Sequence, residues 1–270
     1  MSDHPKRAKA MAQGRTITPG QLWRARQKQQ DAQRFNGMKG KRGFLITANR
    51  GREAQASQEC LQWLDSLPSA AGGGGDGEED DDDEETDIQT LLQREVDSAL
   101  VQQKQRRVFD LGLDCLSLIR CPNRVDPLLA ALDLFKQVSD SGKLQTTHLE
   151  KLIPFQTICH SASDVIVKCA LDLFHAYDKR SECKTFALGV KLRGVQSGAS
   201  SAALDRLGLI KSIADLVVSA QPELRVDLET PDMYIVVEVV RSITGLVIVS
   251  GEDYRNYQRF NLRQLASATA

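Results

Sequence analysis

The stretch that most constrains the fold is Lys184–Arg193, in which apolar side chains alternate with small or charged ones. A period of two over ten residues is typical of a β-strand with one face in a core and the other face free. The free face ends in Lys191 and Arg193, and two positions apart on a strand both cations point the same way. The pair could receive a polyanion, or it could be an ordinary solvated strand end. This stretch alone leaves both interpretations open.

The segment after this strand has the pattern of an amphipathic helix. A turn rich in Ser and Gly follows Gly194, and Ile210, Ile213, Ala214 and Val217 then lie at i, i+3, i+4 and i+7. The sequence therefore predicts a strand, a loop and a covering helix in this order.

Charge is strongly segregated along the chain. Residues 1–52 carry 13 Lys/Arg against 2 Asp/Glu, residues 53–100 carry 1 against 15, and residues 101–270 carry 21 against 19. A basic arm followed by an acidic block indicates contact with nucleic acid or with an oppositely charged surface. Residues 1–38 are predicted to be a flexible basic arm. The eight consecutive carboxylates of Glu78–Glu85 repel one another, so residues 70–87 are predicted to be a disordered acidic insertion.

No early segment has the apolar core of a signal peptide, and no apolar run approaches the roughly 20 residues that span a bilayer. We therefore expect a soluble intracellular protein of the nucleus, nucleolus or cytoplasm. The six cysteines show no spacing typical of a zinc site, so reduced thiols are expected and no metal.

The periodicity predicts two folded units of mixed α and β structure, an α+β class. In residues 39–150 the order of strands and helices is that of a ferredoxin-like domain interrupted by the acidic insertion. The predicted elements are strand Gly43–Asn49, helix Glu53–Leu67, helix Ile88–Gln105, a strand region Val108–Arg120, helix Asp126–Val138 and a strand at Leu149–Phe155. In residues 151–270 they are a helix from Ser161, strand Lys184–Arg193, helix Asp205–Ser219, strands Arg225–Leu228, Met233–Arg241 and Leu246–Val249, and a terminal turn Phe260–Leu265.

Several of these segments, taken in order and spacing, resemble a THUMP domain. They are Ile153–Cys159, Lys184–Arg193, Leu209–Val217, Val226–Leu228, Pro231–Val240 and Arg259–Arg263. More narrowly, the chain is similar to the stand-alone THUMP proteins that act as tRNA-binding adaptors for an RNA cytidine acetyltransferase. The resemblance covers about residues 39–265 and is strongest after residue 150.

The resemblance implies a ferredoxin-like N-terminal domain followed by a THUMP domain, binding the folded body of a tRNA. It implies a protein that is not an enzyme and that assists formation of N4-acetylcytidine in the D-arm of serine and leucine tRNAs. The acetyl-CoA and ATP chemistry would then belong to the partner acetyltransferase. We accordingly expect tRNA and that enzyme as partners, with no membrane, no small-molecule substrate and no cofactor.

RNA binding needs cations that follow phosphates, and several Lys and Arg side chains of this chain are candidates for that role. They are Lys191, Arg193, Arg206, Lys211, Arg255, Arg259, Arg263, Lys41, Arg42, Arg50 and Arg52. Arg255, Arg259 and Arg263 are four apart and would share one helical face if that segment is helical, with Tyr254, Tyr257 and Phe260 between them. Together these cations are expected to form one continuous platform across both units.

Two other function classes stay open at this point. A metal-dependent nuclease would use the carboxylates of Asp232 and Glu238, but Val240 stands where such a site needs a lysine. A protein-interaction scaffold for ribosome or RNA-particle assembly would instead use the acidic insertion and the basic arm. The nucleotide-binding and hydrolase motifs with conserved glycine spacing are absent from the sequence.

Overall fold

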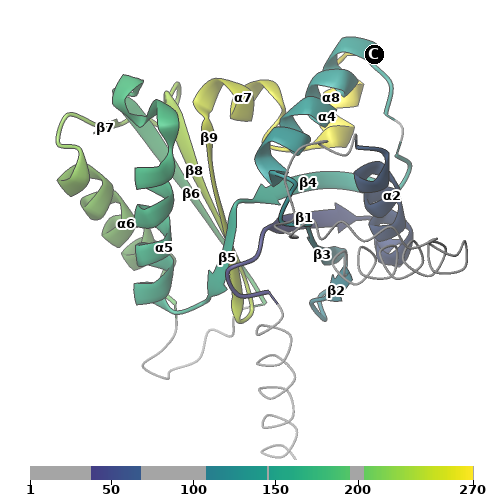
Figure 1. The fold of residues 1–270 in the computed structure, drawn as a ribbon, viewed down its shortest axis with the longest axis horizontal. Helices are drawn as coiled ribbons and strands as arrows, with labels where there is room; N and C mark the ends of the chain where they lie inside the picture. The colour runs from purple at the N-terminus through teal and green to yellow at the C-terminus, as the bar shows by residue number, and fades with distance from the viewer. Residues whose placement is uncertain (1–37, 68–107, 145, 195–203, 270) are drawn as a thin grey trace, which may run out of the picture.

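The computed structural model describes residues 38–67, 108–144, 146–194 and 204–269. The predicted arm up to residue 37, the acidic insertion 70–87 and the predicted helix Ile88–Gln105 lie outside the described residues. Figure 1 shows two sheets side by side, each with its own helices. The expectation of mixed α and β structure is confirmed, with a four-stranded and a five-stranded sheet.

The first sheet is antiparallel throughout, with the spatial order β2-β3-β1-β4. Its strands are β1 (Gly43–Ala48), β2 (Val108–Asp110), β3 (Leu116–Arg120) and β4 (Leu149–Phe155). Helix α2 (Glu53–Ser66) follows β1, and helix α4 (Pro127–Ser141) connects β3 to β4. The Asp126 carboxylate caps α4 by accepting from the amides of Leu128 and Leu129, which fixes where the helix begins.

The region Val108–Arg120 is a hairpin and not one strand, so that expectation was wrong. The chain turns between β2 and β3, where Gly112 and Cys115 have φ values of 63° and 67°. Left-handed backbone conformations interrupt a strand, and a period-two pattern carries no sign of them. The turn thus adds a fourth strand to the sheet and brings residues 111–115 next to the C-terminal end of β1.

The second sheet has the order β5-β9-β8-β6-β7. Its strands are β5 (Thr157–His160), β6 (Thr185–Arg193), β7 (Arg225–Val226), β8 (Met233–Val240) and β9 (Ile243–Ser250). Strands β6 and β8 are parallel and are connected through α6 (Arg206–Ala220), while β8 and β9 form an antiparallel hairpin. Helices α5 (Ser163–Ala176) and α6 cover one face, where Ile166, Ile213 and Ile235 belong to a common buried core. The short 3-10 helix η1 (Asp178–Glu182) leads from α5 into β6.

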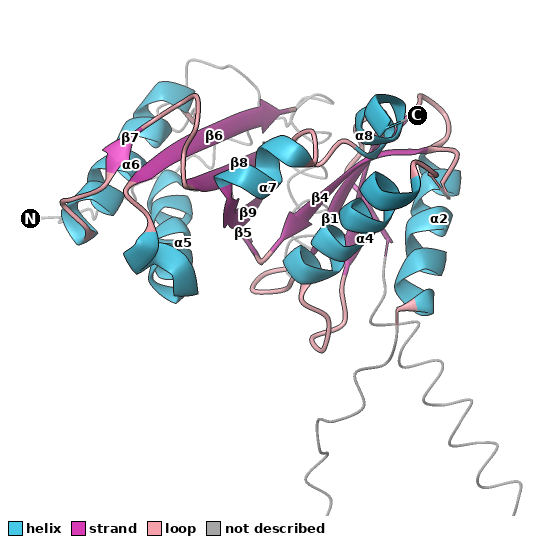
Figure 2. Ribbon diagram, turned by 90° about the horizontal axis from the view of Figure 1, so that it is seen from above, coloured by secondary structure: helices cyan, strands magenta, loops and turns pink. Residues whose placement is uncertain are grey.

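A single bent segment connects the two sheets. Strand β4 continues through Gln156 into β5, and the Gln156 side chain accepts from the amide of Ile248 at 2.9 Å. Phe155 then lies directly over Gly245 of β9, where an added Cβ would be 2.1 Å from the ring. Residues of both sheets share this core, including Phe155 of β4 and Val247 of β9. Figure 2 shows α5 and α6 on one side of the molecule and α2, α4 and α8 on the other.

The C-terminal segment returns to the first sheet. After α7 (Gly251–Asn256) the chain makes a turn in which Gln258, Arg259 and Phe260 all have positive φ, and α8 (Leu262–Thr269) then packs on α4 and β4. The predicted terminal turn Phe260–Leu265 is therefore mostly helix. Within the described ranges, no helix has the length and apolarity that crossing a bilayer requires.

Candidate nucleic-acid interface

The two cations at the end of β6 meet one carboxylate of the neighbouring strand. Glu238 of β8 lies beside Lys191 in the parallel register, and its Oε1 is 3.3 Å from Lys191 Nζ. Its Oε2 accepts from Arg193 Nε at 3.0 Å. Lys191 and Arg193 therefore do point the same way, as their spacing predicts. They are not free charges, however, because a fully buried carboxylate holds both.

Glu238 is buried because its neighbour on the adjacent strand β9 is a glycine, which has no side chain. In the antiparallel register it pairs with Gly245, and the ring of Phe155 lies over that glycine. The side chain of Glu238 has no exposed surface, whereas Lys191 and Arg193 keep 50% and 29% of theirs. A carboxylate without solvent needs cations as partners, so these ion pairs are built into the fold.

A third cation enters from the first sheet. Lys151 of β4 is half-buried, and its pKa is lowered by burial first and then by the charges of Lys191 and Arg193. The carboxylates of Glu238 and Glu150 act in the opposite direction on the same pKa. We call Lys151, Lys191, Arg193 and Glu238 the junction cluster, because the two sheets contribute to it together. Sequence reasoning missed Lys151, since nothing in the pattern of β4 shows that it faces the other sheet.

Further candidate cations lie on elements next to β4 and β8. Arg263 of α8 donates to Glu150 Oε1 at 3.0 Å, beside Lys151 in the chain. With its amide oriented to satisfy both neighbours, Asn49 donates to the same Glu150 oxygen and accepts from Arg263. Arg259 acts electrostatically on the buried Tyr254 hydroxyl, as Glu238 does, which places both charges near that ring.

Arg50 and Arg52 lie at the end of the first sheet where β1 ends and β4 begins. They follow the C-terminus of β1, whose last residue pairs with the first residue of β4. Arg50 is 3.0 Å from Asp114 in an exposed ion pair, and Arg52 is exposed at the start of α2. We call Arg50, Arg52, Arg259 and Arg263 the rim.

The remaining candidates lie elsewhere on the molecule. Arg206 Nε donates to the carbonyl of Val190 at 2.8 Å, which closes the open edge of β6 beyond the short β7. Lys211 is exposed on α6. Lys41 and Arg42 precede β1 beside β5, and three interstrand spacings, roughly 14 Å, separate β5 from β6. The eleven candidates thus form a core of cations at the junction and scattered charges around it.

Arg255, Arg259 and Arg263 do not share a helical face. The left-handed turn at 258–260 separates α7 from α8, and Arg255 donates to the carbonyl of Glu229 at 3.2 Å. The aromatic residues between them also differ from the expectation. Tyr254 stacks on Tyr234 with a centroid distance of 4.1 Å, and Phe260 is fully buried against Phe135. Tyr257 lies against Phe135 as well, so these rings belong to the core and do not form a stacking platform for bases.

The carboxylates of the nuclease hypothesis do not meet. Asp232 Oδ2 accepts from the amides of Lys184 and Thr185 and from the Thr185 hydroxyl, at 2.8 to 3.0 Å. Six residues along an extended strand separate Asp232 from Glu238 by roughly 20 Å, too far to share a metal ion. Within the described ranges, no three His, Cys, Asp or Glu side chains are grouped so that they could hold one. The six cysteines, all of them within the described ranges, form no disulfide.

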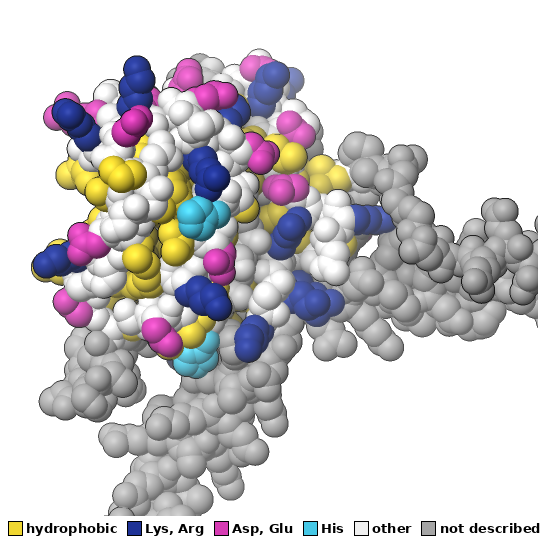
Figure 3. All heavy atoms as spheres, turned by 60° about the vertical axis from the view of Figure 1, so that its left-hand side comes forward, with side chains coloured by type: hydrophobic (Ala, Val, Ile, Leu, Met, Phe, Trp, Pro, Cys, Tyr) yellow, Lys and Arg dark blue, Asp and Glu magenta, His cyan; other side chains and the backbone are white. Residues whose placement is uncertain are grey.

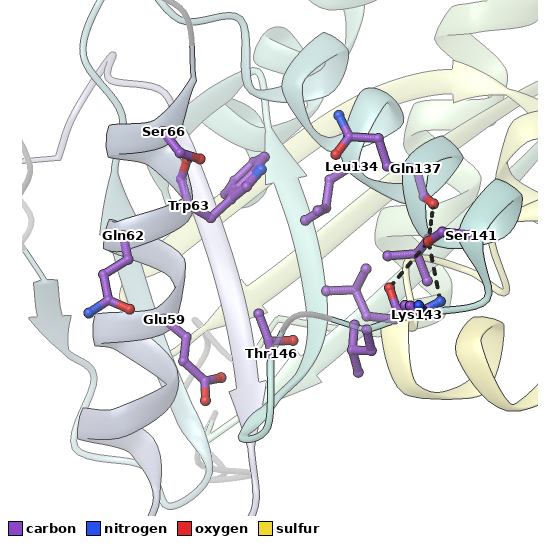
Figure 4. Close-up of a pocket in the computed structure, with 12 residues that line it drawn as sticks. Glu59, Gln62, Trp63, Ser66, Leu134, Gln137, Ser141, Lys143 and Thr146 are labelled. Carbon is purple, nitrogen blue, oxygen red and sulfur yellow. Dashed lines mark hydrogen bonds between the residues drawn. The ribbon is translucent and has the colours of Figure 1, made fainter.

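Two other surfaces are less suited to an anion. The face in Figure 3 brings the α5 and α6 side forward, and on it Lys and Arg side chains are interspersed with Asp and Glu. A cavity of about 230 Å³ is lined by residues of α2 and α4. Figure 4 shows Trp63 and Leu134 on its walls. Glu59 also lines this cavity, and its carboxylate accepts from three backbone amides, of residues 147, 148 and 149. That negative charge disfavours a phosphate there.

The second unit matches a known family. Residues 161–249, from the start of the segment that forms α5 to the end of β9, match the family model described as the THUMP domain. The chain contains a THUMP domain. The junction cluster is thus made by the THUMP domain together with one lysine from the preceding sheet.

Curated relatives carry the same domain name or a tRNA function in theirs. The chain is 24% identical over 179 residues to "tRNA acetyltransferase TAN1" of Saccharomyces cerevisiae, covering 64% of this chain and 61% of that protein. It is 24% identical over 186 residues to "THUMP domain-containing protein 1" of Bos taurus, covering 67% and 50%. The chain therefore spans between half and about three-fifths of the length of these relatives.

Among solved structures, the chain is similar to PH1313 from Pyrococcus horikoshii. The TM-score is 0.43 at 12% identity, and the likeness covers 78% of this chain and 55% of that one. A TM-score of this size adds nothing to the fold described above.

Proposed function

We propose that this protein is a tRNA-binding adaptor that presents tRNA to an RNA cytidine acetyltransferase. The observation that carries the proposal is the junction cluster, in which cations from both sheets gather around one buried carboxylate. The junction cluster and the rim together contain seven cations, and the acids that interact with them are Glu238, Glu150, Asp114 and Glu53. An excess of fixed positive charge on one surface favours a polyanion.

The arrangement favours recognition of the RNA backbone and shape. Exposed lysine and arginine ends can follow phosphates, whereas the aromatic rings near them are buried and unable to stack on bases. We therefore propose that the junction cluster and rim contact the sugar-phosphate surface of folded tRNA. Arg206, Lys211, Arg255, Lys41 and Arg42 would contribute only to a wider electrostatic field.

We also propose the division into a ferredoxin-like domain at 39–150 and a THUMP domain at 151–270. The element order β1-α2-β2-β3-α4-β4 and the antiparallel order β2-β3-β1-β4 support the first assignment. The family match at 161–249 supports the second. Helix α8 belongs to the second range in sequence and lies on the first sheet, so the two domains would fold as a closely connected pair.

The partner and the product are the finer part of the proposal. The resemblance described above implies N4-acetylcytidine in the D-arm of serine and leucine tRNAs, made by a separate enzyme. The name of the yeast relative, a tRNA acetyltransferase, supports the modification but assigns it to that protein itself. Our proposal places the catalytic step in a partner polypeptide, with the present chain in the nucleus, nucleolus or cytoplasm.

Two experiments test the proposal. Gel-shift titration of purified protein with tRNA should show affinity that falls as salt rises. Replacement of Lys191, Arg193 and Glu238 together by Gln, which leaves no buried carboxylate without its cations, should lower the salt slope by about two. Acetylation of tRNA should then be measured with acetyl-CoA and ATP, with the acetyltransferase alone, this protein alone, and both. We expect efficient acetylation only with both. Acetylation by this protein alone would show that it is an enzyme, and tRNA affinity that does not respond to salt would contradict the binding role.

A further inference from the structure

The junction cluster carries more positive charge than its carboxylate can balance. Lys191 takes one oxygen of Glu238 and Arg193 takes the other, so both oxygens already have a cation. Lys151 faces the same group from β4 and forms no ion pair with a described residue. Three cations around one carboxylate leave two positive charges. Because Lys151 is half-buried, water screens its charge less than it would screen that of a fully exposed lysine.

We propose that Lys151, Lys191 and Arg193 bind one phosphodiester group of the RNA backbone, and that Glu238 is the positioning residue that holds Lys191 and Arg193 ready for it. This inference rests on the proposed function and names the RNA group that the site takes. A phosphodiester carries one negative charge, which would balance one of the two positive charges that Glu238 leaves. The side chain of Glu238 does not reach the RNA, because it is completely buried.

Arg193 has the geometry that such a site needs. Its Nε is committed to Glu238, and in the part of the chain that the structure describes its two terminal nitrogens make no hydrogen bond. Guanidinium donors form a planar fork that matches two oxygens of a phosphate. With 29% of its side chain exposed, Arg193 can hold the carboxylate with one nitrogen and offer the other two to solvent-side phosphate.

Lys151 shows the electrostatic strain that an anion would relieve. Its pKa is lowered by burial and by the neighbouring cations, so its charged form is less favourable there than in water. A bound phosphate would favour the charged form again. The site thus combines a guanidinium group hydrogen-bonded to Glu238, an ammonium group in ion-pair contact with the same carboxylate, and a third cation that forms no ion pair with a described residue.

The sharpest test is Glu238→Gln, because two explanations predict opposite results. If the cations act only through their total charge, removal of an acid should raise tRNA affinity. If Glu238 positions them, its removal releases two long side chains, and tRNA affinity should fall about fivefold or more. The salt slope should stay unchanged, since every cation remains. Fluorescence anisotropy with labelled tRNA at several salt concentrations measures both quantities.

Glu150→Gln is the matched contrast. Glu150 also pairs with an arginine at 3.0 Å, but its side chain and that of Arg263 keep 30% and 54% of their surface exposed. Because this pair is open to water, loss of its carboxylate should leave tRNA affinity equal or higher. A fall in affinity for Glu150→Gln as large as that for Glu238→Gln would overturn the special role of the buried carboxylate.

Arg193→Lys keeps the inference testable if Glu238→Gln does not fold, which a thermal melt would show. Lysine retains the charge but cannot hold Glu238 and a phosphate at once, so tRNA affinity should fall although the net charge is unchanged. Affinity equal to that of the unaltered protein would refute the fork. The effects should be the same on tRNA without its 5′-phosphate, since the proposed ligand is a backbone phosphodiester; effects confined to 5′-phosphorylated tRNA would contradict it. If the unaltered protein binds no tRNA at all, the proposed function fails; if it binds and both variants bind equally well, only this inference fails.

Discussion

Gly245→Ala should destabilise the contact that holds the two sheets together. Gly245 is the third residue of β9, and the ring of Phe155 from β4 occupies the space where its side chain would be. A Cβ at this position would be 2.1 Å from two ring carbons and 2.3 Å from a third. Ordinary contacts between carbon atoms are about 3.5 to 4 Å, so the ring would have to move by at least about 1 Å.

The magnitude follows from the burial of Phe155. Its side chain is 1% exposed and belongs to the core that both sheets share, so no open space receives the displaced ring. Overpacking by one carbon in a core costs about 1–3 kcal/mol. We expect the upper part of that range, about 2–3 kcal/mol, which for a chain of this size lowers Tm by roughly 4–10 °C. Because β4 also carries Lys151, tRNA affinity should fall in the variant as well.

Urea denaturation and calorimetry of four proteins give the test: the unaltered chain, Gly245→Ala, Phe155→Leu and the double variant. Phe155→Leu removes the ring that the new methyl group meets, so the two changes should be less than additive, with a coupling energy of about 1–2 kcal/mol. The reasoning is refuted if Gly245→Ala has the stability of the unaltered protein, or if the two single effects simply add.

The other predictions concern four single sites. Gln258→Gly should raise Tm by up to a few degrees, because relief of a left-handed conformation, about 1–2 kcal/mol, exceeds the entropic cost of glycine, about 0.5–1 kcal/mol. Arg259→Gly should be as stable as Gln258→Gly but should bind tRNA more weakly. A lower Tm for both variants would contradict this reasoning. Asp232→Asn should lower Tm at neutral pH: hydrogen bonds from two backbone amides lower the pKa of Asp232, so its stabilisation is present above the ordinary carboxyl pKa and is lost as pH falls through the folded value. The Tm difference should therefore vanish in acid, and a difference that persists there would argue against the charge. In Lys151→Arg, tRNA affinity should fall less as pH rises than it does in the unaltered protein. The pKa of the lysine is lowered by burial and by two neighbouring cations, so the lysine loses its charge earlier as pH rises. Identical pH profiles would show that Lys151 does not contact RNA.

The local elements were largely predictable because each depends on short-range pattern. The alternation in Lys184–Arg193 predicted β6, and the apolar stripe of Ile210–Val217 predicted the buried face of α6. The hairpin β2–β3 was not predicted, since the left-handed turn at Gly112 and Cys115 leaves no trace in hydrophobic periodicity. For the same reason the shared helical face of Arg255, Arg259 and Arg263 could be stated only on the condition that the segment is helical, and three residues with positive φ divide it.

The candidate site shows the same division. Spacing alone placed Lys191 and Arg193 on one side of a strand, which the structure confirms. It gave no sign that Glu238, forty-five residues from Arg193 in sequence, would hold both, or that Lys151 would face them from another sheet. These contacts depend on strand order and on the missing side chain at Gly245, which are long-range properties.

The sequence by itself determined where the chain can form strands and helices, where its charge is concentrated, and which cations share a side of their own strand. Only the tertiary structure decided which charges meet. The physical reason is that periodicity fixes the direction of a side chain relative to its own backbone, whereas the neighbour it reaches depends on how distant strands pair and pack. The junction cluster is therefore a property of the folded pair of sheets and not of any one segment.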